Sequence, residues 1–418
     1  MKTRKIVVLA ILFILIGSIF AGTISALDRN APAAKPALEN VRAYAAPTTS
    51  DGATLVVDGG NLLAGSVNNW APVETPSGVI VNAVTTDATD PNLIYIGAAN
   101  ELAIYRSADG GTNWMRIPLT NDFIGGVTAI AVDSAQRLVY VGTDTAGLFR
   151  LRDVGSSMIV NGRLQVDAPV LEIAADSSGS GMVLARTASK LFRAENYGLR
   201  WLEVSNLGSS PTALAIAQTT SATIYVGTTD RGVLKSTDGL TWSTANEGLG
   251  MAPGTRLEVN ALAIDPQQPN VIYVATSYLF GSTTLHETPL GVSMSTDGGT
   301  SWAMLNAMPE TTVVELLPLA GEPAGVYALT STSRTPLALG NTTAIENAAA
   351  LAQAETAAVT SSAPQAATSM RTIVAWVIAG LAALALSFAL ATDLGRRRQR
   401  TATGNAEPAV EPGYVKHS

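Results

Sequence analysis

Two kinds of short apolar segment alternate along most of the chain, and both are typical of β-strands. The more recognisable one is a run of the form Ile-Tyr-Ile-Gly, which first occurs at residues 94–97 and recurs every 42 to 54 residues. A more apolar run precedes each copy, and turn-forming residues join the two. The pattern predicts six strand pairs, at 81–84 with 94–97, 127–130 with 139–142, 170–173 with 182–185, 212–215 with 224–227, 259–262 with 272–275, and 313–316 with 326–329.

A second motif follows most of these pairs. Residues 107–114 and 295–302 fit the pattern S-x-D-x-G-x-x-W, a copy at 236–242 is one residue short, and weaker copies at 151–158 and 194–201 keep the spacing. Asp can accept hydrogen bonds from its own turn, Gly takes positive φ, and Trp packs the turn against a sheet. The motif therefore predicts a structural turn. Its residues are Ser107, Asp109, Gly111, Trp114, Asp153, Gly155, Asn196, Gly198, Trp201, Ser236, Asp238, Trp242, Ser295, Asp297, Gly299 and Trp302.

This motif resembles the Asp box, or bacterial neuraminidase repeat, of sialidases, sortilin-type receptors and photosystem II stability and assembly factors. The resemblance covers residues 81–330. It implies that each box is the hairpin between the third and fourth strands of a propeller blade. Six pairs then predict an all-β, six-bladed β-propeller, with seven blades as the alternative if residues 54–64 add a hairpin. The last pair has no box, so we expect residues 66–73 to close the ring as its fourth strand.

Apolar segments at the two ends predict membrane targeting. Residues 1–26 begin with basic residues and continue as an apolar run, which is typical of a signal peptide or a signal anchor. Residues 372–392 carry no charge and would span roughly 30 Å as a helix, enough to cross a bilayer. Four arginines follow them, so the positive-inside rule predicts a single-pass cell-membrane protein with a cytoplasmic C-terminus and an extracytoplasmic propeller.

These segments define the expected domain organisation. The propeller is expected at 51–340, between an Ala/Pro-rich linker at 27–50 and an Ala/Ser/Thr-rich stalk at 341–370. A transmembrane helix at 371–393 and a cytoplasmic tail at 394–418 complete the chain.

Charge and cysteine usage narrow the class of partner. Residues 27–370 hold 17 basic and 30 acidic side chains, a net charge of −13. Such an acidic domain is not expected to bind nucleic acid or an anionic lipid surface. The chain has no cysteine, which excludes thiolate catalysis and iron–sulfur clusters and favours a prokaryotic envelope protein.

Patterns for catalysis and metal binding are weak. In sialidases, the resemblance implies an arginine in an Arg-Ile-Pro motif before the first box, whereas Arg116-Ile-Pro118 follows the first clear box here and is interpreted as a strand end. His286 is the single histidine of residues 27–370 and has no metal-ligand spacing around it. We therefore expect no catalytic residues, no metal and no cofactor, with a glycosidase left open.

The remaining candidate is a protein surface on the face opposite the boxes. There the longest predicted turn, 276–290, carries three aromatic side chains, which either bind a partner or pack back on the turn. The repeats resemble those of the photosystem II assembly-factor-like group, which implies a scaffold or assembly factor. Its partner is expected to be another membrane or envelope protein. The alternative is a glycan-binding or sialidase-like glycoside hydrolase propeller. The candidate binding residues are Tyr278, Phe280, His286, Arg231, Asp230 and Arg256.

Overall fold

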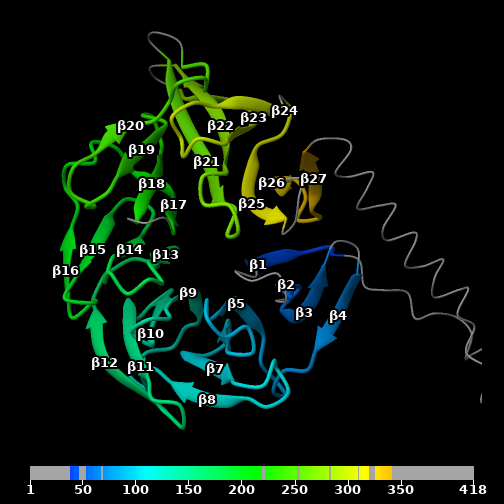
Figure 1. Cartoon of the computed structure of the whole chain (residues 1–418), viewed down its shortest axis with the longest axis vertical. Helices are drawn as coiled ribbons and strands as arrows, with labels where there is room; N and C mark the ends of the chain where they lie inside the picture. The colour runs from blue at the N-terminus through cyan, green and yellow to red at the C-terminus, as the bar shows by residue number, and fades with distance from the viewer. Residues whose placement is uncertain are drawn as a thin grey trace, which may run out of the picture. The chain divides into compact units, whose positions relative to one another are not determined.

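The computed structural model describes residues 38–46, 53–66, 69–218, 222–251, 255–281, 284–308, 310–319 and 325–340. Within these residues, seven antiparallel sheets follow one another around a ring (Figure 1). Six of the sheets have four strands, and the seventh has three. The fold is therefore an all-β, seven-bladed β-propeller, and each sheet is one blade.

The first four blades cover the N-terminal half of the ring. Blade 1 contains β1 (Val41–Ala45), β2 (Thr54–Asp58), β3 (Asn61–Ser66) and β4 (Asn69–Val73). Blade 2 contains β5 (Val81–Thr86), β6 (Ile94–Ala98), β7 (Ala103–Ser107) and β8 (Met115–Pro118). Blade 3 contains β9 (Val127–Asp133), β10 (Leu138–Thr143), β11 (Leu148–Asp153) and β12 (Met158–Leu164). Blade 4 contains β13 (Glu172–Ala175), β14 (Val183–Arg186), β15 (Leu191–Glu195) and β16 (Arg200–Glu203).

The last three blades complete the ring. Blade 5 contains β17 (Pro211–Ala217), β18 (Thr223–Thr228), β19 (Val233–Ser236) and β20 (Ser243–Thr244). Blade 6 contains β21 (Arg256–Ile264), β22 (Ile272–Phe280), β23 (His286–Ser295) and β24 (Ala303–Ala307). Blade 7 contains β25 (Val313–Leu319), β26 (Gly325–Thr330) and β27 (Leu337–Gly340).

The prediction of six blades was wrong by one. Residues 54–64 do form a hairpin, β2 with β3, and β1 supplies the inner strand of that extra blade. Because β1 spans Val41–Ala45, the propeller begins within the segment expected to be a linker at 27–50. The prediction that residues 66–73 close blade 7 was wrong, since β4 pairs with β3 inside blade 1, and blade 7 has three strands among the residues that the structure describes.

The Ile-Tyr-Ile-Gly pattern follows from how neighbouring blades pack. From blade 1 to blade 7, the first strand of each blade contacts the first strand of the blade that follows it in the chain. A Cβ added at Gly97 would lie 2.3 Å from Cγ1 of Val127, and one at Gly227 would lie 2.6 Å from Cγ1 of Val259. These distances are too short for any side chain, so glycine at this position lets the inner valine of the next blade pack closely.

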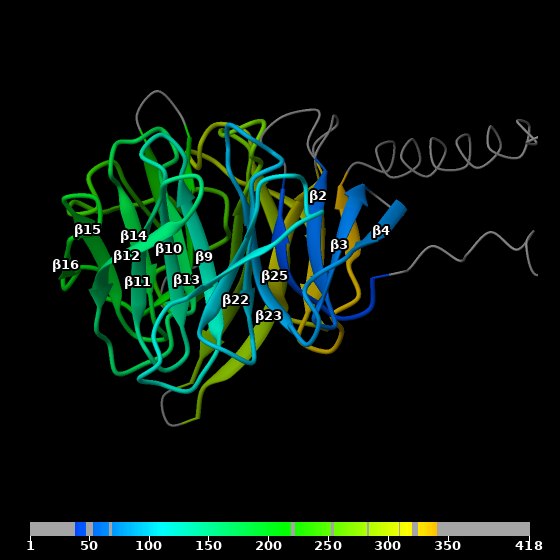
Figure 2. The same ribbon diagram turned by 90° about the horizontal axis from the view of Figure 1, so that it is seen from below.

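Apolar packing between blades forms the core and also closes the ring. Seven buried clusters each join two neighbouring blades. The cluster between blades 7 and 1 contains Leu317, Tyr327 and Leu329 packed against Val56 and Trp70. Figure 2 shows the blades from the side, with their strands stacked around the ring. Blade 7 therefore seals against blade 1 through side chains rather than through a shared sheet.

No helix among the described residues is long and apolar enough to cross a membrane. The expected signal segment at 1–26, the stalk at 341–370, the transmembrane helix at 371–393 and the tail at 394–418 all lie outside the described residues.

Candidate functional site

The antiparallel order of each blade divides its turns between two faces of the ring. Turns between third and fourth strands, which hold the Asp-box-like segments, lie on one face, named here the box face. Turns between second and third strands and the connections between blades lie on the opposite face, named the connection face.

On the box face, the motif residues bind their own turns. Asp109 accepts hydrogen bonds from the Asn113 backbone N–H at 2.8 Å and from Ser107 Oγ at 2.8 Å. These bonds hold the pKa of the Asp109 carboxyl at about 2, below its usual range. Asp238 and Asp297 make the same kind of bonds and have lowered pKa values for the same reason. These carboxylates therefore stabilise their own turns by accepting hydrogen bonds from them.

The weaker copy at Asp153 is different, because its carboxylate is buried. Asp153 Oδ2 accepts hydrogen bonds from the Tyr95 hydroxyl at 2.6 Å and from Arg106 Nε at 2.7 Å, both from blade 2. Burial raises the pKa of Asp153, but the hydrogen bonds from Tyr95 and Arg106 outweigh it and the net shift is downward. The turn of blade 3 is thus fixed to blade 2.

Tyrosines from the second strands make this link between blades repeatedly. The Tyr140 hydroxyl donates to the Tyr197 carbonyl in the box turn of blade 4, and the Tyr225 hydroxyl donates to the Gly298 carbonyl in the box turn of blade 6. In blade 6 the equivalent residue is Tyr273, whose buried hydroxyl has no hydrogen-bond partner among the described residues. The box turns are therefore structural joints between blades.

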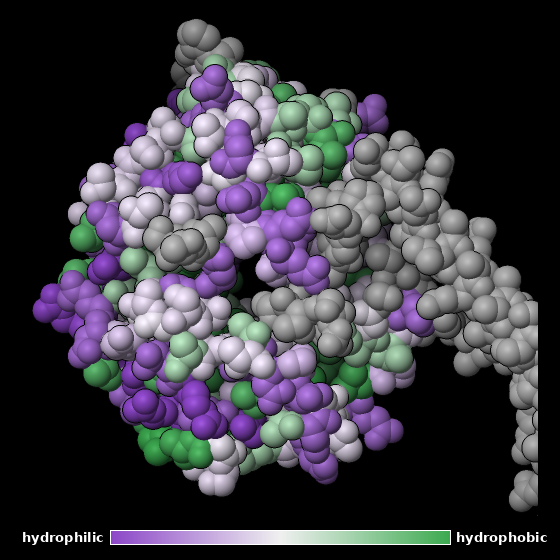
Figure 3. All heavy atoms as spheres, viewed as in Figure 1, coloured by the Kyte–Doolittle hydropathy of each residue, from purple (hydrophilic) through white to green (hydrophobic). Residues whose placement is uncertain are grey.

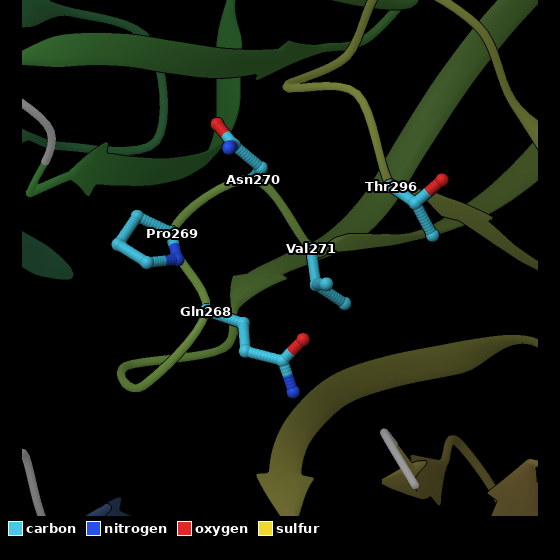
Figure 4. A pocket seen from close by; sticks show the side chains of 5 residues that line it. All are labelled: Gln268, Pro269, Asn270, Val271 and Thr296. Atoms are coloured by element: carbon cyan, nitrogen blue, oxygen red, sulfur yellow. The ribbon is translucent and has the colours of Figure 1, made fainter. Parts of the chain in front are cut away.

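A shallow depression also lies on the box face. It measures about 370 Å³ and is lined by Gln268, Pro269, Asn270, Val271 and Thr296. Figure 4 shows that the Gln268 and Asn270 side chains point in different directions, so their amide groups do not converge on one ligand position. We assign no function to this depression.

The connection face carries the predicted aromatic residues, but on strands rather than in a long loop. The expected turn at 276–290 is largely the extension of β22 and β23, whose pairing continues to Phe280 opposite His286. The Phe280 and His286 rings stack with their centroids 5.4 Å apart. Phe280 remains 52% exposed, whereas the Tyr278 hydroxyl donates to the Gly250 carbonyl of the neighbouring connection. The hairpin therefore presents Phe280 rather than Tyr278.

The charged candidates flank this hairpin without forming one cluster. The Asp230 carboxylate accepts a hydrogen bond from the Ser209 hydroxyl, and Arg231 Nη1 donates to the Leu207 carbonyl at 2.6 Å. Both therefore fix the connection between blades 4 and 5. Arg256 begins β21 opposite Leu279 of the hairpin, with its side chain exposed.

Large apolar side chains are exposed along the same face. Met251 and Leu285, which are 42% and 57% exposed, lie on the segments next to Phe280. Three more exposed apolar residues lie on the connections that lead into blades 3 and 4. One of them, Ile124 before blade 3, is 95% exposed. The six residues, named here the apolar rim, are Phe123, Ile124, Leu171, Met251, Phe280 and Leu285.

At the centre of the ring, polar side chains line a channel. Figure 3 shows hydrophilic residues around a hollow at the middle of one face. On the connection face, Asn40, Arg42, Asn82 and Arg334 line a cavity of about 330 Å³. Arg334 Nη1 lies 3.0 Å from Glu315 Oε2, and Arg186 Nε lies 2.7 Å from Glu172 Oε2. The name channel mouth is used below for six of these residues, Arg42, Asn82, Glu172, Arg186, Glu315 and Arg334.

One carboxyl group of the channel mouth titrates near neutral pH. Burial raises the pKa of Glu315 to about 7, an effect that the Arg334 cation opposes and the Glu172 charge strengthens. Burial also raises the pKa of Glu172, against the effect of Arg186. The sequence did not lead us to predict Glu315 as a site residue. A signal was present, because the equivalent position of the inner strand is Ala in blades 2, 5 and 6 and Glu in blade 7.

No group of three or more His, Asp or Glu side chains that could hold a metal ion occurs among the described residues. His286 packs on Phe280, and Arg116 of the Arg-Ile-Pro segment pairs with Glu101 at 2.5 Å on the outer part of blade 2. Arg116 therefore lies away from the channel mouth, in a strand-end position.

No known protein family and no curated protein matches the sequence. Among solved structures, the chain is similar to the GH74 xyloglucanase from Xanthomonas campestris, with a TM-score of 0.53 and 18% identity over 71% of this chain and 51% of that one. It is similar also to YCF48 bound to D1 peptide, with a TM-score of 0.51 and 16% identity over 73% of this chain and 94% of that one. The chain thus spans about half the length of the xyloglucanase.

These likenesses show that the chain has the β-propeller fold. At such low identity they show nothing further, because one fold carries many functions. One neighbour is a glycoside hydrolase and the other is a propeller in complex with a peptide.

Proposed function

We propose that this protein is a membrane-anchored, extracytoplasmic scaffold that binds another membrane or envelope protein through its connection face. The observation that carries the proposal is the apolar rim, six large apolar side chains exposed on one face. Exposed apolar side chains with an aromatic anchor are typical of protein-binding surfaces. The stacked Phe280–His286 tip holds that anchor on a paired hairpin, which lowers the entropy cost of binding.

The test compares two double variants, each of which replaces two exposed apolar residues with serine. Phe280→Ser with Leu285→Ser removes the part of the apolar rim that lies on the blade 6 hairpin, whereas Ile159→Ser with Val160→Ser removes exposed apolar residues from the outer strand β12. Each variant is expressed in place of the native protein in the cells that make it. Proteins cross-linked to it in the membrane are then quantified by mass spectrometry. We expect the hairpin variant to lose its main partner and the β12 variant to keep it. Equal recovery from both variants would contradict the proposal.

Anchoring in the membrane is part of this proposal and needs its own measurement. The support is the uncharged run at 372–392 followed by four arginines. A chain truncated after residue 370 should leave the membrane fraction during carbonate extraction, while the full chain should remain. Release of both proteins would remove the anchor from the proposal without affecting the binding surface.

A glycan-binding or glycoside hydrolase function is the second candidate, favoured by the channel mouth. Its cavity of about 330 Å³ is lined by polar side chains, and Glu315 has a pKa of about 7, as a general acid requires. A panel of sialosides and other glycosides, assayed with wild type and Glu315→Gln, tests it. Turnover that disappears in the variant would place this candidate first.

A further inference from the structure

The box turns differ from blade to blade in what they expose. In blades 2 and 6 the turn contains two glycines and a threonine after its Asp, so it exposes small or polar residues. In blades 3, 4 and 5 the turns expose large apolar side chains instead. These residues, named here the box patch, are Val154, Tyr197, Leu199 and Leu240, and they are 37% to 55% exposed.

Blades 3, 4 and 5 are consecutive in the ring (Figure 1), and hydrogen bonds link their box turns. Arg150 Nε on β11, which leads into the turn of blade 3, donates to the Tyr197 carbonyl in the turn of blade 4 at 2.5 Å. Arg193 Nε on β15 of blade 4 donates to the Asp238 carbonyl in the turn of blade 5 at 2.8 Å. Bonds between blades therefore fix the residues of the box patch relative to one another.

Tyr197 occupies a backbone position that favours glycine. Its φ is +55°, and the equivalent residues of blades 2 and 6 are Gly110 and Gly298, with φ of +68° and +69°. Tyrosine takes this conformation at a cost in free energy that glycine does not have. The Tyr197 ring lies over Gly181, where an added Cβ would be 2.9 Å from ring atoms Cδ1 and Cε1. Since glycine would form the turn more easily, the exposed ring rather than the turn accounts for tyrosine here.

The box patch also lies in a basic part of an acidic domain. Residues 137–200, which cover most of blades 3 and 4, hold eight basic and six acidic side chains, a net charge of +2. The rest of residues 27–370 holds nine basic and 24 acidic side chains, a net charge of −15. Blades 3 and 4 therefore differ in sign from the remainder of the domain.

Two arginines next to the box patch are available to a ligand. Arg152 lies on the same side of β11 as Arg150 and two residues nearer the box turn. Its side chain is exposed, and among the described residues its guanidinium has no hydrogen bond or ion pair. Arg137, which is 55% exposed, lies 3.7 Å from the Asp153 carboxylate, whose charge Arg106 already balances at 2.7 Å. Both arginines therefore carry positive charge that the protein itself does not neutralise.

We propose that the box patch binds an acidic segment of a partner protein, whose apolar side chains pack on Tyr197 and Leu199 while its carboxylates approach Arg152 and Arg137. Exposed tyrosines and arginines are among the residues that most often dominate protein binding. The inference is carried by the strained tyrosine and by the unneutralised arginines beside it. The box patch lies on the face opposite the apolar rim, so it is a second contact surface and does not rest on the first.

Charge favours a narrow protein segment over the other anionic surfaces that could meet this face. A flat anionic membrane would also meet the exposed carboxylates of Asp109 and Asp297 in the box turns of blades 2 and 6. A second copy of the chain would bring the same net charge of −13 over residues 27–370, and like charge opposes self-association. An extended segment contacts blades 3 to 5 alone and avoids both costs.

The first experiment uses the full chain in detergent micelles and a displayed library of random short peptides. Each round removes peptides that bind the Tyr197→Gly and Leu199→Ser double variant, so the retained peptides require the box patch. We expect acidic peptides that contain aromatic or aliphatic residues. The most enriched peptide is labelled and titrated by fluorescence anisotropy, beside a copy in which amides replace all its carboxylates. The acidic peptide should bind with an affinity that falls as salt rises, and the amide copy should bind weakly.

Three single variants locate the bound peptide. Tyr197→Gly should weaken binding about tenfold or more, while its melting temperature stays close to that of wild type because glycine takes the same φ in blades 2 and 6. Arg152→Gln should weaken binding about three- to tenfold in low salt and much less in high salt. Arg116→Gln, on the outer strand of blade 2, is the matched control and should leave binding unchanged.

Four outcomes would overturn the proposal. They are the absence of enriched peptides, equal binding of the amide copy, undiminished binding by Tyr197→Gly, and a different occupant. Binding to phosphatidylglycerol vesicles that is lost in Tyr197→Gly would identify a lipid surface, and self-association lost in the same variant by sedimentation would identify a second copy. The Phe280→Ser and Leu285→Ser variant should bind the peptide normally, which separates failure of the box patch from failure of the apolar rim.

Discussion

Replacing Asp153 with Asn removes one negative charge from a buried joint between blades 2 and 3 and leaves its shape almost unchanged. The Asp153 and Arg106 side chains are 1% and 10% exposed, and their charged atoms lie 2.7 Å apart. Asn can still accept the hydrogen bond from the Tyr95 hydroxyl. Its NH2 group cannot accept the bond that the Gly155 backbone N–H makes to Asp153 Oδ1 at 2.7 Å, so the substitution removes the charge and one hydrogen bond.

The expected cost follows from the buried cation that remains. Breaking a buried ion pair by removing one partner costs about 3–5 kcal/mol, because the other charge stays desolvated. Exposed Arg137 lies 3.7 Å from the same carboxylate and can rearrange into water, so it adds little to the cost. We expect Asp153→Asn to lose about 3 kcal/mol of unfolding free energy at pH 7.

Chemical denaturation at several pH values measures this loss. The pKa of Asp153 is lower in the folded protein, so its contribution is present above the unfolded-state pKa and disappears as pH falls through the folded value. The difference between wild type and variant should therefore shrink in acid. In a double-mutant cycle, adding Arg106→Met should cost less in the Asp153→Asn background than in wild type. A loss under 1 kcal/mol, or strictly additive effects, would refute the reasoning.

Three further predictions concern stability. Burial raises the pKa of Glu315 to about 7, so the folded state holds its proton more tightly than the unfolded chain, and stability from this group should decline between about pH 4.5 and 7; Glu315→Gln should flatten that part of a melting-temperature profile. Gly111 has φ of +92° and an added Cβ would lie 2.5 Å from Val73 Cγ1, so Gly111→Ala should cost more unfolding free energy than Gly78→Ala, where φ is +82° and no atom lies within 4 Å; equal losses in urea titrations would show that crowding is irrelevant. Tyr225→Phe should lose about 1 kcal/mol, whereas Tyr273→Phe should be neutral or stabilising in thermal unfolding, because its hydroxyl has no partner among the described residues.

The fold class could be predicted from the repeating pattern because the features that make up the pattern are local in sequence. Alternating apolar residues, glycines at close contacts and box turns recur in each blade, so the all-β propeller could be recognised from five or six copies. Blade 1 was harder to see, because β2 ends in Asp58 and lacks the Gly of the pattern. Its inner strand still carries the signal, since Val41-Arg-Ala43 matches Val81-Asn-Ala83 and Val259-Asn-Ala261 in both sequence and bulged register.

The candidate site was predictable only in part. Phe280 and His286 could be found because the segment between the second and third strands of blade 6 is longer than its equivalents. The channel mouth could not, because Arg42 and Arg334 come from opposite ends of the propeller and line one cavity only after the ring closes. Residues 276–290 were predicted as a turn but are largely paired strand. Cross-strand pairing extends the hairpin further than the local turn residues indicate, so this difference also arises from contacts that are not local in sequence.

The contact between blades 7 and 1 has a consequence for the order of events during synthesis. The Val41 backbone N–H donates to the carbonyl of Arg334, a residue 293 positions further along the chain. Contacts so distant in sequence form late, since a long loop must close before they add stability. Until β25 and β26 emerge, Val56, Leu63 and Trp70 have no partner surface. An unfinished chain therefore exposes these apolar side chains until blade 7 has been made, and this surface is where a chaperone or an aggregation event would first act.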